Sequence, residues 1–159
     1  MNKNKLEMIV NNIVGDAIVK EVMSLKLAVK LIEAVEDKAK EMGLAVVVAV
    51  SDASGRPIAV HCMDGAYHGS FDVAVNKTYT STAFQMSTAK LSRLCQPGQE
   101  LYGLQFGNNG KVMILGGGEP LMVGKTMIGA LGVSGASAQE DTDLAAYGAS
   151  ALKEVIKCL

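Results

Sequence analysis

The stretch KVMILGGGEPLMVGKTMIGALGVSGASAQEDTD, residues 111–143, decides the fold of this chain. It begins with a short apolar segment, 112–115, which predicts a strand, and three glycines follow at 116–118. Residues 121–123 and 127–134 flank a Gly-Lys turn and predict a β-hairpin. Because glycine lets another backbone or a ligand come close, the triple glycine predicts either a sharp corner of the sheet or the floor of a pocket.

The rest of the chain supplies helices and a second strand pair. Helical spacing of apolar residues predicts helices over 25–42, 71–86, 88–94 and 141–157. Ser24 and Ser70 are the predicted N-caps of the first two. Residues 44–50 and 57–63, joined by an SDASG turn, predict a second antiparallel pair. Two hairpin-linked strand groups separated by helices predict a single α+β domain built around a mainly antiparallel sheet.

The amino-terminal residues are predicted to form a helical extension that precedes the domain. Residues 5–20 place Leu6, Ile9 and Ile13 on one stripe, as in an amphipathic helix. A helix this short is marginal alone in water, so we expect it to dock on its own domain, on another subunit or on a partner. The predicted division is residues 1–22 as the helical extension and 23–159 as the domain.

Composition excludes several classes of function. The 159 residues are 49% hydrophobic and 19% charged, with a net charge of -1, which indicates one globular domain without a basic surface for nucleic acid. The chain has no Trp, and no apolar run approaches the roughly 20 residues of a membrane helix. The three cysteines form no CxxC pair, which favours free thiols in a reducing cytoplasm over a local zinc or iron–sulfur site.

Two histidines are the candidate metal ligands. His61 lies in a predicted strand beside Cys62 and Met63, and His68 lies in the loop before the third helix. Such side chains could ligate iron or another soft metal, and His68 is preferred because loop residues beside glycines can reach a ligand. The alternative is an exposed strand-end histidine and an ordinary loop histidine.

Charged residues near the glycine turns are a second group of candidates. Lys77, on a hydroxyl-rich helix, could face an anionic ligand or lie in solvent. Asp141, near a helix start, could cap that helix or bind a ligand. No pair of carboxylates and no nucleophile with a base stands out, so residue chemistry alone favours a binding protein and leaves enzymatic activity open.

Three stretches together carry a family resemblance: VVVAVSDASGRPIAVHCMDGA, VAVNKTYTSTAF and ILGGGEPLMVGKTMIGALGVSGASAQEDTDLA. They resemble the GlcG/HbpS family of heme-binding-like proteins, which includes the carboxy-terminal domain of PduO-type corrinoid adenosyltransferases. QPGQELYGLQ is similar to the PduO-type and OrfY-like branch, and the resemblance spans about residues 24–156. It implies a profilin-like five-stranded antiparallel sheet, a homo-oligomer that is often an octamer, and binding of heme or a corrinoid such as cobalamin. It does not imply adenosyltransferase activity, because it leaves out the ATP- and cobalamin-handling domain of PduO.

The resemblance also marks candidate site positions. The expected cofactor-binding residues are Asp64, Lys77, Gly116, Gly117, Gly118, Glu119, Pro120 and Asp141. No axial ligand of the family transfers to this chain, so the assignments of His61 and His68 rest on the residues alone.

The extension before Ser24 resembles the encapsulation peptides of bacterial microcompartment cargo in length and pattern. The resulting hypothesis is a heme- or cobalamin-binding homo-oligomer, cytoplasmic or in a microcompartment lumen for diol or similar small-metabolite use, with residues 5–20 contacting the shell. Two alternatives remain open. One is an enzyme acting on a small organic acid or aldehyde in a Gly116–Gly118 cleft, with Lys77 in an acid/base role. The other is an oligomeric structural or assembly protein.

Overall fold

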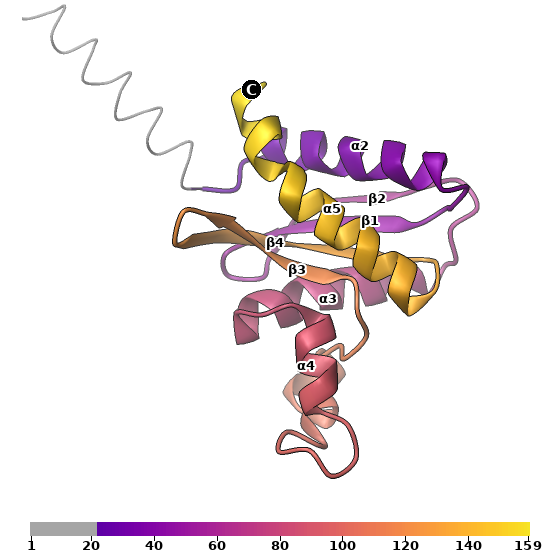
Figure 1. Cartoon of the computed structure of the whole chain (residues 1–159), viewed down its shortest axis with the longest axis vertical. Helices are drawn as coiled ribbons and strands as arrows, with labels where there is room; N and C mark the ends of the chain where they lie inside the picture. The colour runs from indigo at the N-terminus through magenta and orange to yellow at the C-terminus, as the bar shows by residue number, and fades with distance from the viewer. Residues whose placement is uncertain (1–21) are drawn as a thin grey trace, which may run out of the picture.

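The computed structural model describes residues 22–159, which form an antiparallel sheet with helices on both faces (Figure 1). The strands are β1 (Val47–Asp52), β2 (Pro57–Cys62), β3 (Gly118–Val123) and β4 (Thr126–Ser134), in the spatial order β2-β1-β4-β3. The helices are α2 (Leu25–Glu41), α3 (Ser70–Phe84), α4 (Thr88–Leu94) and α5 (Ala138–Lys157). α2 and α5 cover one face of the sheet and α3 covers the other (Figure 1). The prediction of an α+β domain around an antiparallel sheet is therefore confirmed.

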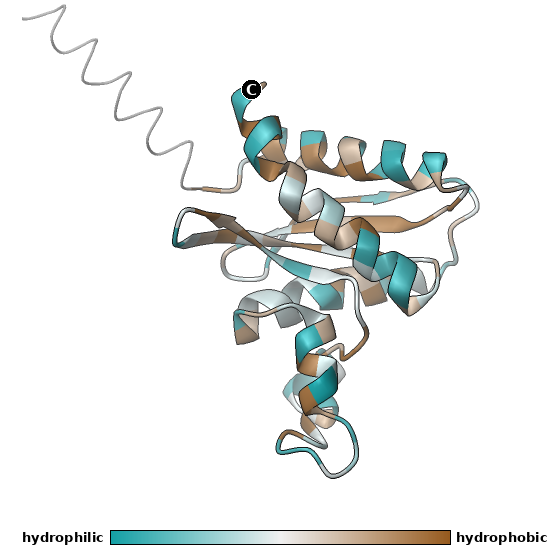
Figure 2. Cartoon of the chain, in the orientation of Figure 1, coloured by the Kyte–Doolittle hydropathy of each residue, from teal (hydrophilic) through white to brown (hydrophobic). Residues whose placement is uncertain are grey.

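Burial follows the alternation of side chains along the central strands. In β1, Val48 and Val50 belong to the main core between the sheet and helices α2 and α5, whereas Val47 and Ala49 face α3. Because both faces of β1 are covered, its sequence is apolar at every position up to Val50, as Figure 2 shows by colour. β2 and β3 are the edge strands.

Helix α2 begins as the sequence predicts, with the Ser24 side chain accepting a hydrogen bond from Leu27 N–H at 3.2 Å. Helix α3 differs from the prediction, because Gly69 precedes it without a side-chain cap and Ser70 is its first residue. Its buried side is largely polar and includes Lys77 and Thr78. The helix approaches β4 so closely that a Cβ at Gly132 would meet the Ala74 carbonyl oxygen.

Helix α5 begins at Ala138, three residues before the predicted start at Asp141. Ser137 and Glu140 form a capping box, in which the Ser137 side chain accepts from Glu140 N–H and the Glu140 carboxylate accepts from Ser137 N–H. Asp141 is therefore not the cap of this helix, which leaves its carboxylate for another partner.

The prediction of a strand at 112–115 is wrong, and the described residues contain four strands and not five. The segment is tied to helix α3 instead: the Thr80 hydroxyl accepts from Met113 N–H at 2.8 Å and contacts the Lys111 carbonyl at 3.3 Å. Val112 is buried in a small cluster with Leu91 and Cys95 rather than on the sheet. A side chain of α3 thus takes the place of a neighbouring strand.

The predicted amphipathic extension, residues 1–22, and its shell-contacting segment, residues 5–20, lie outside the described residues except for Val22. Among residues 22–159, no helix combines the length and the apolar character needed to cross a membrane.

Candidate functional site

Lys77 and Asp141, both candidates from the sequence, form a buried ion pair. The Lys77 Nζ donates to Asp141 Oδ2 at 2.8 Å and to the Val133 carbonyl oxygen at 2.6 Å. The two side chains are only 1% and 5% exposed. The other carboxylate oxygen, Asp141 Oδ1, accepts from Ala136 N–H at 3.1 Å. The pair therefore connects α3, the end of β4 and the first turn of α5.

Burial lowers the pKa of Lys77 below its ordinary value, while the hydrogen bond and the negative charge of Asp141 act in the opposite direction. The ammonium group has its charge balanced by Asp141 and its hydrogen bonds made within the protein. This geometry supports a structural role for the pair.

The three glycines fold tightly around this pair. All of them are buried, and Gly117 has φ +109°. A Cβ at Gly117 would lie 2.8 Å from the Lys77 Nζ, from the Asp141 Cβ and from the Val133 carbonyl oxygen. Gly118 N–H donates to the Thr88 hydroxyl at 2.8 Å, which fixes the segment to α4. Of the two sequence interpretations, a sheet corner or a pocket floor, the packing matches the corner.

The remaining residues of the candidate cofactor set are spread over the surface. Glu119 and Pro120 are partly exposed on the edge strand β3, and burial raises the pKa of the Glu119 carboxyl. Asp64 is exposed in the turn after β2. The structure therefore brings Lys77, Asp141 and Gly117 together and leaves Asp64 and Glu119 on separate elements.

The two histidines have different surroundings. His61 lies on β2, and its Nδ1 is 3.0 Å from Glu36 Oε1 of helix α2. Its side chain is 36% exposed and that of Glu36 is 17% exposed. A carboxylate on Nδ1 orients the ring and favours the tautomer in which Nε2 carries a lone pair for a metal. His68 is exposed in the loop before α3.

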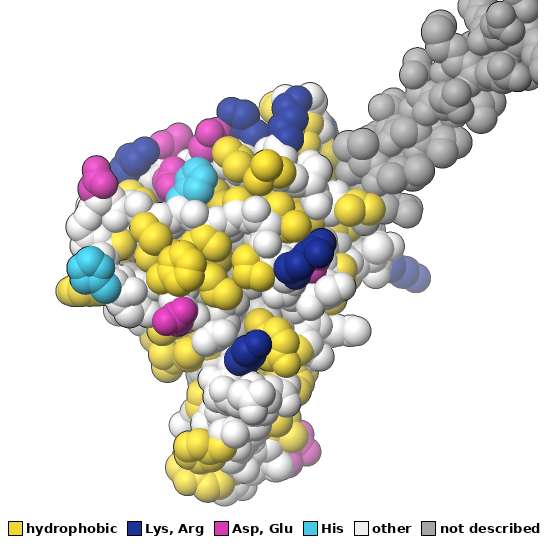
Figure 3. Space-filling view, turned by 180° about the vertical axis from the view of Figure 1, so that it is seen from behind, with side chains coloured by type: hydrophobic (Ala, Val, Ile, Leu, Met, Phe, Trp, Pro, Cys, Tyr) yellow, Lys and Arg dark blue, Asp and Glu magenta, His cyan; other side chains and the backbone are white. Residues whose placement is uncertain are grey.

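An apolar surface, here called the β2-edge surface, lies on the side of the molecule that carries the histidines. It consists of Val60, Ala66, Tyr67, Phe71 and Val75. Tyr67 and Phe71 are 73% and 45% exposed, and the other three pack partly buried against Val47, Ala49 and Ala74. Figure 3 shows both histidines on this side of the molecule, with apolar side chains grouped near them. Because β2 is an edge strand, its outer backbone groups are also open to a partner.

Two cavities lie away from the glycines. One, of about 470 Å³, lies between the β3–β4 hairpin and the second half of α5. The other, of about 300 Å³, lies between α2 and α5 and is lined by Lys30, Tyr147 and Val155, among others.

Residues 22–159 contain no cluster of three His, Cys, Asp or Glu side chains able to hold a metal ion. A tetrapyrrole needs only one or two axial ligands from the protein, so this absence does not bear on its binding. The three thiols are free, as the sequence predicts; Cys95 is buried, and Cys62 and Cys158 are exposed.

Sequence reasoning missed Glu36 as the partner of His61 and missed the apolar residues around β2. Glu36 lies on the outer face of a predicted helix, where a glutamate is usually solvated. The pattern of Tyr67, Phe71 and Val75 carried a signal, because the spacing of four places these side chains on one side of α3 and its entry.

The sequence and the fold are similar to those of known proteins. Residues 23–150 match a family model described as "Haem degrading protein HbpS-like". A protein encoded in the dhaT–dhaS intergenic region of Citrobacter freundii is 39% identical over 123 residues, which cover 77% of this chain and 87% of the relative. The corrinoid adenosyltransferase PduO of Salmonella typhimurium is 37% identical over 116 residues, which cover 73% of this chain but 34% of that protein.

A solved structure shares both the fold and the sequence pattern. The structure of a PduOC:heme complex superposes with a TM-score of 0.78 at 35% identity, over 82% of this chain and 94% of that one. That relative is described as a complex with heme.

Proposed function

The chain belongs to the HbpS-like family, and we propose that it is a tetrapyrrole-binding protein that holds heme or a corrinoid. The support is the family match, the heme complex of a relative at 35% identity and the similarity to a corrinoid adenosyltransferase. The similarity to PduO covers 34% of that protein, so we propose binding and not adenosyl transfer.

The observation that carries the proposal is His61, oriented by Glu36 on the side of the molecule that carries the β2-edge surface. A tetrapyrrole requires a flat apolar surface for its macrocycle and a nitrogen or similar ligand for its metal. His61 lies on the α2 side of β2 and the β2-edge surface lies on its α3 side, so the two meet at the open edge of this strand and together offer both features to a ligand that covers the edge. When bound, the iron or cobalt supplies redox and ligand-exchange chemistry.

We assign the axial position to His61 rather than to His68. The contact at 3.0 Å with the Glu36 carboxylate holds the His61 ring and makes its Nε2 a better donor, whereas His68 lies in an exposed loop. In this proposal Lys77 and Asp141 do not contact the ligand but stabilise the fold, because they are paired with each other. Asp64 and Glu119 remain candidates for contacts with polar substituents of the ligand.

The test is absorbance titration of the purified protein with hemin and, separately, with cobalamin. We expect a saturable Soret shift at a fixed stoichiometry, abolished or weakened at least tenfold in His61→Ala and retained in His68→Ala, which is the matched control. Glu36→Gln, which keeps the shape but not the charge, should weaken binding less and change the Soret position. A broad change that never saturates indicates adventitious binding to apolar surface and contradicts the proposal. Loss of the Soret shift in His68→Ala alone would assign the axial ligand to His68 in the loop and contradict the assignment to His61.

We further propose that copies of the chain associate through the β2-edge surface and enclose the ligand between them. An exposed edge strand beside exposed aromatic residues is a surface that proteins usually cover. Phe71→Glu should then reduce the mass measured by light scattering, whereas Tyr102→Glu, at an aromatic residue 60% exposed elsewhere, should not. An unchanged mass in Phe71→Glu would contradict this mode of assembly.

The similarity to PduO supports, as a further part of the proposal, a place in a bacterial microcompartment, with residues 5–20 as the targeting segment. Residues 1–22 fused to a fluorescent protein should give puncta in cells that make the compartment. A diffuse signal would remove targeting from the proposal without affecting tetrapyrrole binding.

The enzyme alternative loses its main support in this structure. It needed an open cleft at Gly116–Gly118 with an available Lys77, but the three glycines are buried and Lys77 is paired. We therefore do not propose a reaction at these residues.

A further inference from the structure

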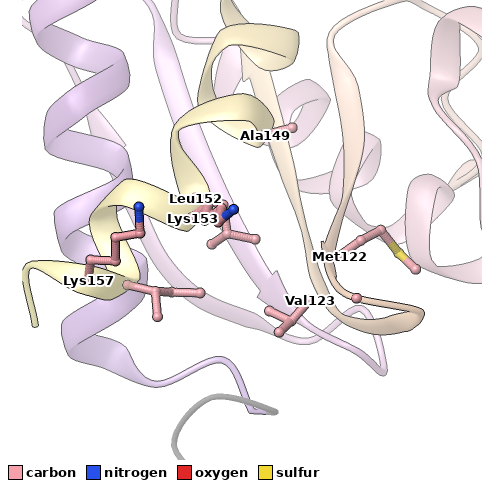
Figure 4. A pocket seen from close by; sticks show the side chains of 8 residues that line it. Met122, Val123, Ala149, Leu152, Lys153 and Lys157 are labelled. Carbon is pink, nitrogen blue, oxygen red and sulfur yellow. The ribbon is translucent and has the colours of Figure 1, made fainter.

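The cavity of about 470 Å³ between the β3–β4 hairpin and α5, here called the hairpin groove, is not used by the proposed ligand site. Its walls are apolar and consist of Met122, Val123, Gly124, Ala149, Leu152 and Ile156, with Lys153 and Lys157 also lining it. Figure 4 shows the side chains from the hairpin and from α5 facing one another across it. Met122 is 45% exposed, so apolar surface on one wall remains uncovered.

The described chain begins beside this groove. Met23 is only 4% exposed and belongs to the main core, against which Val123 and Ile156 of the groove also pack. Lys26 Nζ donates to the Leu159 carbonyl oxygen at 3.0 Å, so the start of α2 lies at the end of α5 (Figure 1). Whatever precedes Met23 therefore enters the domain next to the hairpin groove.

The sequence before Met23 has the matching chemistry. Residues 6–18, LEMIVNNIVGDAI, carry an apolar stripe, and their only charged side chains are Glu7 and Asp16. Both are acidic, whereas the charged residues of the groove are the two lysines. Within 6–18 the apolar stripe and the acidic side chains both match the groove, and Lys5 and Lys20 lie just outside this stretch.

The dimensions allow part of such a helix to lie in the groove. A helix over residues 6–18 would be about 20 Å long, and the groove follows α5 from Ala149 to Lys157, about 12 Å at the same rise per residue. Residues 19–22 can span up to about 13 Å when extended, which is enough for the preceding residues to turn back onto the domain.

We propose that residues 6–18 bind in the hairpin groove of their own chain, with the stripe of Ile9 and Ile13 against Met122 and Ile156. Docking would cover the exposed apolar wall and place the acidic side chains near Lys153 and Lys157. A partner that recognises the same stripe must then displace the segment from the groove, so binding of such a partner is weaker in the full chain than for the isolated segment. This inference does not depend on tetrapyrrole binding.

The absence of Trp from the sequence allows a direct test on the full chain. Ile13→Trp places a single reporter on the apolar stripe, and Asn11→Trp places one away from it. We expect blue-shifted emission and a several-fold lower rate of acrylamide quenching for Ile13→Trp, and water-like emission for Asn11→Trp. Water-like emission in both would overturn the proposal.

The groove itself is then altered in the Ile13→Trp background. Met122→Glu puts a charge on the exposed wall and should return the emission of Ile13→Trp to that of water. The matched control is Met42→Glu, at a methionine 39% exposed at the end of α2, which should leave the emission unchanged. Blue-shifted emission that survives Met122→Glu would mean that the segment is buried elsewhere and would refute the assignment.

A mixing experiment separates docking within one chain from exchange between copies. Chains with Ile13→Trp and Met122→Glu are unfolded and refolded together with an excess of unaltered chains, whose grooves are intact and which lack Trp. If the segment binds its own groove, the emission stays water-like. Recovery of the blue shift would show binding to a second copy and would overturn the proposal as stated.

Discussion

Removal of the Asp141 carboxylate should destabilise the protein strongly. In Asp141→Ala, the ammonium group of Lys77 stays at a position where its side chain is 1% exposed, and the Val133 carbonyl is its remaining hydrogen-bond partner among the described residues. The Ala136 N–H also loses its acceptor. Removing one partner of a buried pair costs about 3–5 kcal/mol, because it leaves an uncompensated charge.

This loss is large compared with the total stability of the protein. Domains of this size have a free energy of unfolding of about 5–15 kcal/mol. At a few degrees per kcal/mol, the midpoint of thermal unfolding should fall by about 10–20 °C. Urea denaturation followed by far-ultraviolet circular dichroism measures the free energy, and calorimetry measures the midpoint.

The pH dependence gives the prediction its specific signature. Burial already lowers the pKa of Lys77 in the folded state, and loss of Asp141 lowers it further. Between that lowered pKa and the ordinary value of 10.5, the unfolded chain binds more protons than the folded one, so stability rises with pH. The rise is larger in Asp141→Ala than in the original chain. The difference in unfolding free energy between the two should therefore shrink as the pH is raised from neutrality toward 10.

The double variant Lys77→Met, Asp141→Leu is the control, because replacing both charges with apolar groups of similar size removes the buried charge. It should recover most of the stability lost in Asp141→Ala. A loss below about 1 kcal/mol in Asp141→Ala, or a difference that stays constant with pH, would refute the view that the pair is a desolvated ion pair.

Two further predictions concern the segment next to this pair. Gly117→Ala places a Cβ 2.8 Å from the Lys77 Nζ at a residue with φ +109°, and it should lower the free energy of unfolding in a urea titration by about 2–6 kcal/mol. Gly103→Ala has φ +96° but open space around it, so it should lose only the backbone strain of about 1–3 kcal/mol. Equal losses would show that packing is not the cause. In thermal melts, Glu119→Gln should be more stable than the original chain at pH 7 and equal to it at pH 4. Burial raises the pKa of the Glu119 carboxyl, so its ionisation lowers the stability of the folded state only when the pH rises above the ordinary pKa of a glutamate. A gain in stability that persists at pH 4 would contradict this.

Much of the fold was readable from the sequence because its elements carry regular patterns. The apolar run of β1 and the Ser24 cap of α2 were both identified, since burial and capping select residue types locally. The prediction of a strand at 112–115 was wrong because apolar side chains there are partly buried, as in a strand, while the Met113 N–H donates to the Thr80 hydroxyl of α3 instead of to a neighbouring strand. A sequence pattern reports burial but does not reveal which partner satisfies the backbone.

The candidate site was readable in part. Lys77 and Asp141 were each singled out, but their pairing across 64 positions depends on how α3 and α5 meet at the end of β4, which no local pattern encodes. The Glu36–His61 contact was missed for the same reason. The hairpin groove depends on the gap between β3–β4 and α5, and packing geometry of this kind is set by the assembled fold.

Because Lys77 is buried, the rate at which its amine reacts with an added reagent reports how often this domain opens. Lys30 and Lys157, whose side chains are 57% and 58% exposed, offer their amines to an acylating reagent continuously. Lys77 can react only while the 116–118 corner has separated from α3 and α5, and only in its neutral form. Its acylation rate, read by mass spectrometry beside that of the exposed lysines, would therefore report how often the centre of the fold comes apart under native conditions.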